Sequence, residues 1–124
     1  GKTGTPLELV WRNDELSDPP GSRPEGFSEE NRMTSRIITV VAPHRLVFTW
    51  GESAEVSIEL QALGKEVLLT LVHRRLADRT TKLNVSAGWH AHLDILAARL
   101  QEKEPGPFWD SWLGLKEEYE RRIP

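Results

Sequence analysis

The chain has 124 residues, a net charge of −3 and no cysteine, which suits one domain of ordinary size that buries its own core. Without cysteine, a disulfide framework and a thiolate metal site are both excluded. Charges of both signs are mixed along the chain, so no basic surface points to nucleic acid. No apolar run approaches the roughly 20 residues of a membrane span. A chain without cysteine is compatible with a reducing compartment, and we expect a cytoplasmic protein.

The chain opens with a predicted strand and a long loop. Residues 5–13 alternate between apolar and polar side chains, with Trp11 on the apolar face. Residues 14–33 are broken by prolines and glycines and contain one aromatic residue, Phe27. A loop of this length is unusual in a compact domain. It is either a surface excursion or a lid over a cavity mouth, with Phe27 as its anchor.

Four further strands are predicted, joined by short turns. Sequential strands usually pair, so these segments predict an antiparallel meander. The last of them is apolar on both faces, which favours a central position in the sheet. Phe48 and Trp50 share one face of their strand, and His73 alternates with inward apolar residues. The four segments are residues 34–42, 45–50, 55–63 and 66–74.

The strongest helical period in the chain lies at Asn84–Leu100. Asn84 or Ser86 can cap its first turn, and residues 76–83 are predicted to form a connection. About 17 residues make a helix roughly 25 Å long. Because each strand needs its apolar face covered, we predict that this helix crosses one face of the sheet. Its apolar stripe contains Val85, Trp89, His92, Leu93, Leu96 and Leu100.

A second helix is predicted from Pro107, after the break at Glu104–Pro107. Its apolar stripe includes Phe108 and Trp112, with Trp109 beside it. This helix either packs back on its own domain or serves as a dimerisation or partner helix, because it has much apolar area to bury.

The histidines do not form a site of recognisable chemistry. His90 and His92 are two residues apart and point away from each other on a helix, whereas paired metal ligands are three or four apart. We therefore predict no metal and no cofactor. His73 is interpreted as a hydrogen-bonded histidine of the core or cavity edge, and proton transfer is the alternative role. No catalytic residue is assigned.

Four stretches together carry a resemblance to a known family: PHRLVFTWG, VSIELQALGKEVLLTLVHRRL, GWHAHLDILAARL and PFWDSWLGLKEEY. They resemble bacterial proteins of the heat-shock chaperone ATPase activator homologue family (the Aha-type domain), within the START-like, SRPBCC superfamily. The resemblance runs from about Leu7 to Tyr119. It implies an α+β helix-grip fold, in which a curved antiparallel sheet grips a long C-terminal helix with a cavity between them. The short helix predicted at the C-terminus of this chain is an addition to that fold.

The resemblance also implies a first strand and two short helices ahead of the segment where this chain begins. We therefore expect residues 1–124 to form a single START-like domain that is incomplete at its N-terminus. A sheet edge left open in this way invites pairing with another chain. A second copy of the chain is one expected partner, in a homodimer formed through that edge or through the C-terminal helix.

The leading interpretation is a START-like domain that binds a hydrophobic small molecule between sheet and C-terminal helix, without demonstrable catalysis. The alternatives are a chaperone-associated or other protein-interaction module, and a cyclase-like enzyme that uses a cavity histidine. The same side chains can also pack as solid core. The predicted pocket residues are Trp11, Phe48, Trp50, His73, Trp89, His92, Leu93 and Leu96, with Phe27 as the lid.

Overall fold

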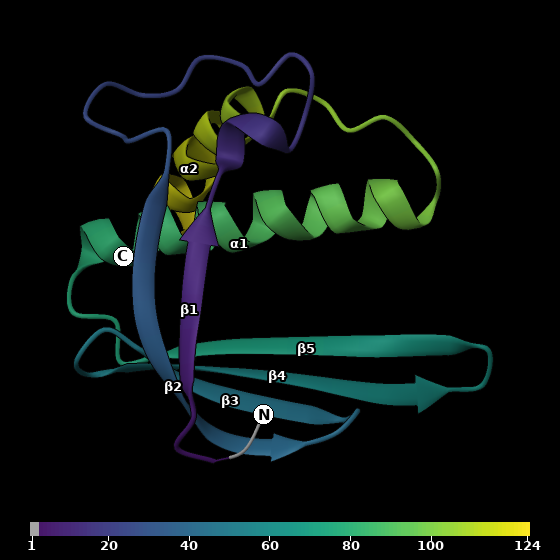
Figure 1. The fold of residues 1–124 in the computed structure, drawn as a ribbon. Coiled ribbons are helices and arrows are strands. Elements are labelled where there is room, and N and C mark those ends of the chain that lie inside the picture. The colour runs from purple at the N-terminus through teal and green to yellow at the C-terminus, as the bar shows by residue number, and fades with distance from the viewer. Residues whose placement is uncertain (1–2) are drawn as a thin grey trace. The chain divides into compact units, whose positions relative to one another are not determined.

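The computed structural model describes residues 3–124. Within that range the chain forms five strands, two α-helices and one 3-10 helix, which confirms the predicted α+β class (Figure 1). Two compact units can be distinguished. One contains the N-terminal stretch up to Val10 and residues 32–77, and the other contains residues 11–31 and 78–124. No helix in the described part of the chain is long and apolar enough to cross a membrane.

The first unit carries the sheet, whose strands follow one another in the order β1-β2-β3-β4-β5. The pairs from β2 onward are antiparallel, so the predicted meander is confirmed. The alternating burial along β1 also matches its predicted apolar face. The strands span Pro6–Trp11 (β1), Asn31–Val41 (β2), Arg45–Trp50 (β3), Ala54–Leu63 (β4) and Glu66–Arg74 (β5).

The predicted central position of the last strand is wrong, because β5 lies at one end of the strand order. It pairs with β4 in continuous register from Glu55↔Arg74 to Leu63↔Glu66. Each strand of a meander pairs with its neighbours in the chain, so the final strand ends at an edge. Its apolar residues on both faces misled the prediction, and Val67 is 63% exposed.

Cross-strand register places three buried apolar residues of this unit in one row. Ile37 pairs with Phe48, Phe48 with Val56, and Val56 with His73. Because side chains of paired residues lie on the same face of a sheet, these four share a face. Ile37, Phe48 and Val56 are buried. This row is therefore the apolar centre of the first unit.

The long helix α1 spans Arg79–Leu100 and begins five residues before the predicted start at Asn84. Its N-cap is Asp78, whose carboxylate accepts a hydrogen bond of 2.7 Å from the Thr81 backbone N–H. Backbone and side-chain hydrogen bonds from Thr81 also lower the pKa of the Asp78 carboxyl. Asn84 and Ser86 are therefore not caps. The first turn, RTTK, contains no apolar residue, so the periodicity did not reveal it.

The second helix, α2, spans Phe108–Arg122 and packs on α1. Their shared core joins a stripe of small residues on α1 to the aromatic face of α2, which confirms that the C-terminal helix packs back on its own chain. Within this unit, the residues of α1 that are buried are therefore not those of the predicted apolar stripe. Leu96 and Leu100, which belong to the predicted stripe, are exposed. The core consists of Ala87, Ala91, Ile95, Phe108, Trp109 and Trp112.

The loop that follows the 3-10 helix η1 (Asn13–Glu15) is docked on the start of α2. Ser17 Oγ accepts a hydrogen bond of 2.8 Å from the Phe108 N–H. The Pro20 carbonyl accepts one of 2.9 Å from the Trp109 N–H. The first N–H groups of a helix have no partner within the helix. The loop therefore supplies the capping groups that α2 lacks in its own sequence.

Aromatic side chains of α2 also pack against the same loop. The Phe27 ring lies edge-on to Trp109 and Trp112, at centroid distances of 5.6 and 5.1 Å. The Trp109 indole N–H donates a 2.7 Å hydrogen bond to Asp14 Oδ1. Phe27 thus holds the loop against α2. Its role as a lid stays a prediction.

Candidate functional site

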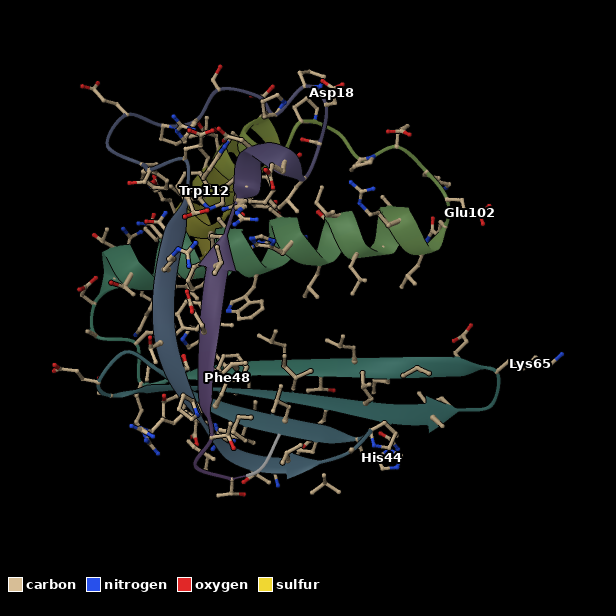
Figure 2. All side chains as sticks on the ribbon, in the orientation of Figure 1. Asp18, His44, Phe48, Lys65, Glu102 and Trp112 are labelled. Carbon is tan, nitrogen blue, oxygen red and sulfur yellow. The ribbon has the colours of Figure 1, made fainter. Side chains whose placement is uncertain are left out.

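One face of the sheet brings together three of the predicted pocket residues. The rings of Trp50, at the end of β3, and His73, in β5, are 4.7 Å apart between centroids and meet edge-on at 67°. Phe48 lies two residues before Trp50 on the same face, and it is buried (Figure 2). An aromatic surface with one imidazole therefore lies in the first unit.

Ser35 is a member of this face that the sequence reasoning missed. It precedes Ile37 by two residues in β2, so the two side chains share a face. Ser35 is 1% exposed, and its Oγ has no hydrogen-bond partner among the described residues. A buried hydroxyl without a partner costs about 1–3 kcal/mol. The sequence did contain a signal for Ser35, because it stands where the alternation along the strand places side chains on the same face as Ile37.

Burial determines the protonation of His73. Desolvation lowers the pKa of this imidazole below its ordinary value of 6.5, because a charged ring is disfavoured away from water. Near neutral pH the ring is therefore uncharged, with one nitrogen able to donate and the other able to accept a hydrogen bond. Such a group can orient a polar atom of a ligand.

The predicted pocket residues outside the sheet face lie in the second unit. Trp11 is half-buried at the end of β1, Trp89 and Leu93 are half-buried on α1, and Leu96 is exposed. The His92 ring lies 5.0 Å from the Phe108 ring, so it takes part in the packing of the two helices. The predicted pocket lining draws on both units and stays a prediction.

The two histidines of α1 have different surroundings, as their spacing predicted. His90 Nδ1 is 2.9 Å from the Tyr119 hydroxyl, and its Nε2 is 3.7 Å from Asp94 Oδ2. His92 faces Phe108 instead. Across residues 3–124, no group of three or more histidine and carboxylate side chains is placed to hold a metal ion.

We expect the free energy of unfolding to fall as the pH drops below about 6.5. Burial lowers the pKa of His92 and of His73 below 6.5. Below that pH the unfolded chain takes up protons that the folded chain resists, so unfolding becomes easier. This contribution to stability is complete above pH 6.5 and is lost as the pH falls through the folded-state pKa values. Urea denaturation at a series of pH values measures it.

The control for this pH dependence is an exposed histidine. His92→Leu should flatten the dependence, whereas His44→Asn, in the turn between β2 and β3, should leave it unchanged. An unaltered pH dependence in a chain with both His92→Leu and His73→Leu would show that other groups are responsible.

The family described as Activator of Hsp90 ATPase homolog 1-like protein matches residues 21–101, more than half of the chain. A solution NMR structure of a protein from Bordetella parapertussis is similar, with 33% identity and a TM-score of 0.79. That similarity covers 99% of this chain and 68% of the other. No curated protein matches. The predicted family is therefore confirmed.

Proposed function

We propose, since this chain belongs to the Activator of Hsp90 ATPase homolog 1-like family and has an SRPBCC-type fold, that it binds a hydrophobic small molecule. The observation that carries this proposal is the edge-on contact of Trp50 with His73 on the apolar face of the sheet. Small-molecule sites are usually lined by apolar and aromatic side chains with a few placed polar groups. We further propose that the chain works as one START-like domain.

The side chains of the sheet face suggest what the ligand offers. Phe48 and Trp50 suit an apolar or aromatic body. The Ser35 hydroxyl and the neutral His73 imidazole suit one polar group, such as a hydroxyl or a carbonyl, because each can donate or accept a hydrogen bond. We therefore propose an apolar ligand with a single uncharged polar end. The remaining lining candidates, Trp11, Trp89, His92, Leu93 and Leu96, and the lid candidate Phe27 stay predictions.

Ser35→Ala separates a binding role from a purely structural one. The change removes a buried hydroxyl that has no partner among the described residues, so the stability of the empty protein should stay the same or rise. Affinity for the fluorescent probe 1-anilinonaphthalene-8-sulfonate should depend on the apolar wall, and Trp50→Ala should weaken it about tenfold. Native mass spectrometry of protein purified without delipidation should detect a bound apolar molecule, reduced in Ser35→Ala.

The matched control is Val72→Ala, in the same strand as His73 but on the opposite face. It should leave both probe affinity and the bound mass unchanged. Equal probe affinity in the wild type and Trp50→Ala, together with no bound mass in either, would contradict the proposal.

The alternative functions gain less support. A protein-interaction role was linked to Trp109 and Trp112, and both are buried inside the second unit. Because these two side chains are buried, they are not available for a homodimer contact through α2. We therefore propose the sheet edge as the surface through which a homodimer would form. A chaperone-associated role is supported by the family description and predicts a changed ATPase rate of the cognate chaperone. An enzymatic role still depends on His73 as the proton-transfer group.

A further inference from the structure

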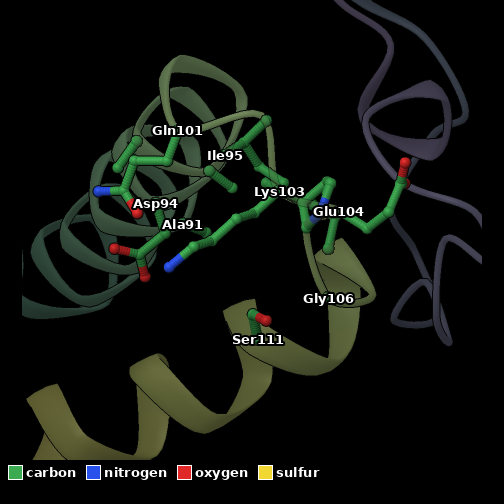
Figure 3. A pocket seen from close by; sticks show the side chains of 12 residues that line it. Ala91, Asp94, Ile95, Gln101, Lys103, Glu104, Gly106 and Ser111 are labelled. Carbon is green, nitrogen blue, oxygen red and sulfur yellow. The ribbon is translucent and has the colours of Figure 1, made fainter.

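A groove lies wholly within the second unit, between the C-terminal half of α1, residues 101–107 and the first turns of α2 (Figure 3). We propose that it binds a small zwitterion with an apolar body, namely a free α-amino acid with an apolar side chain. Its volume is about 350 Å³, which falls in the range of small-molecule sites. The groove shares no residue with the sheet face, so this inference is independent of the proposed function.

The floor of the groove is apolar and belongs to the core of the unit. Ile95 and Phe108 are buried there as members of the core shared by α1 and α2. Ala91 and Ala98 lie along the α1 wall, and their small side chains leave room for a guest. A branched aliphatic side chain placed on this floor would be removed from water, which is favourable by about 25 cal/mol per Å² of apolar surface.

Residues 101–107, the linker between α1 and α2, are held in place beside this floor. Glu102 has a left-handed backbone conformation with φ of 57°. Its N–H donates to the Arg99 carbonyl at 3.1 Å, and the Lys103 N–H donates to the Ala98 carbonyl at 2.8 Å. These two bonds form the Schellman motif that ends many helices. The turn of the chain at Glu102 brings Lys103 to the groove, where its side chain extends toward Asp94 (Figure 3).

Opposite charges therefore face each other across the opening. Asp94 and Lys103 both line the groove, yet no ion pair within 4 Å joins them in the part of the chain that the structure describes. The ammonium and carboxylate of an α-amino acid are attached to one carbon, so a single ligand can satisfy both. The ligand ammonium would contact Asp94, and its carboxylate would contact Lys103 and the Ser111 hydroxyl.

Asp94 has a histidine beside it, one turn earlier on α1. His90 Nε2 lies 3.7 Å from Asp94 Oδ2, and its other nitrogen is held by the Tyr119 hydroxyl at 2.9 Å. The His90 ring thus lies between the Asp94 carboxylate and the Tyr119 hydroxyl of α2. Exposed charge pairs contribute little by themselves, so we expect millimolar affinity that requires the apolar side chain and both charges together.

Heteronuclear NMR titration of the whole chain with L-leucine tests the proposal. Saturable shifts are expected in the amides of Ala98, Lys103 and Ser111. Isopentylamine and 4-methylpentanoate keep the aliphatic body and lack one charge each, and each should bind at least about tenfold more weakly. Asp94→Asn and Lys103→Gln should each weaken leucine binding by a similar factor.

Two control variants each remove one charge, negative or positive, at a position outside the groove. Glu117→Gln, exposed on α2, and Lys65→Gln, in the turn between β4 and β5, should bind leucine as the wild type does. Absence of saturable shifts, equal binding of the singly charged compounds, or full affinity in Lys103→Gln would each overturn the proposal. Lys103 lies in the linker, so this variant keeps the test decisive even where Asp94→Asn disturbs α1.

Discussion

Replacing Phe108 by alanine should lower the free energy of unfolding by about 3–5 kcal/mol. Phe108 is 1% exposed, and its ring lies 5.0 Å from the rings of both His92 and Trp109. Truncation would leave a cavity where α1 and α2 meet, because the surrounding aromatic rings can collapse only in part. Most native proteins are stable by about 5–15 kcal/mol, so the loss is large. Urea denaturation followed by circular dichroism measures it.

Leu113→Ala is the matched control for Phe108→Ala. Leu113 is a large apolar residue on the same helix, but it is 38% exposed. Because little of its contact with other residues is lost, the expected change is at most about 1 kcal/mol. Equal losses in the two variants would mean that α2 does not bury its aromatic face in solution.

Gly21→Ala should cost at least about 2 kcal/mol, because two penalties act together. Gly21 has a φ of +83°, a conformation that L-residues rarely adopt. An added Cβ would also lie 2.7 Å from Asp110 Oδ1 and 2.9 Å from the Asp110 nitrogen. Relief of this clash would shift Asp110 and weaken its hydrogen bond from the Ser22 N–H. Urea denaturation gives the loss, and hydrogen exchange reports whether the loop has detached from α2.

Gly26→Ala separates the two penalties. Gly26 has a similar φ of +87°, but nothing lies within 4 Å of its added Cβ. It should therefore show only the conformational penalty of about 1–2 kcal/mol. A smaller loss in Gly26→Ala than in Gly21→Ala is the expected result. The same loss in both would show that the loop is not packed against α2.

The strands of the meander were predictable because their signal is local. Alternation along residues 45–50 and 66–74 predicted β3 and β5 with the bounds that the structure has. The start of α1 was missed for an equally local reason, since its first turn contains no apolar residue. A helix period becomes visible only where apolar residues repeat.

Within the candidate site, the sequence predicted Phe48, Trp50 and His73 on one sheet face, and the structure brings them together there. It did not predict Ser35, because a serine in a strand ordinarily indicates a solvated position. Nor did it identify the groove that we propose binds an apolar α-amino acid, whose walls come from α1, the linker and α2. No periodicity joins those three segments.

The sequence by itself determined the α+β class and the two helices, because these follow from local periodicity, and it determined the family through four stretches that resemble known members. Only the tertiary structure decided that Phe27 rests on Trp109 and Trp112 and that Ser17 and Pro20 cap α2. The physical reason is the same in each case. These contacts join residues distant in the chain, and they depend on how finished elements pack, which no local pattern encodes.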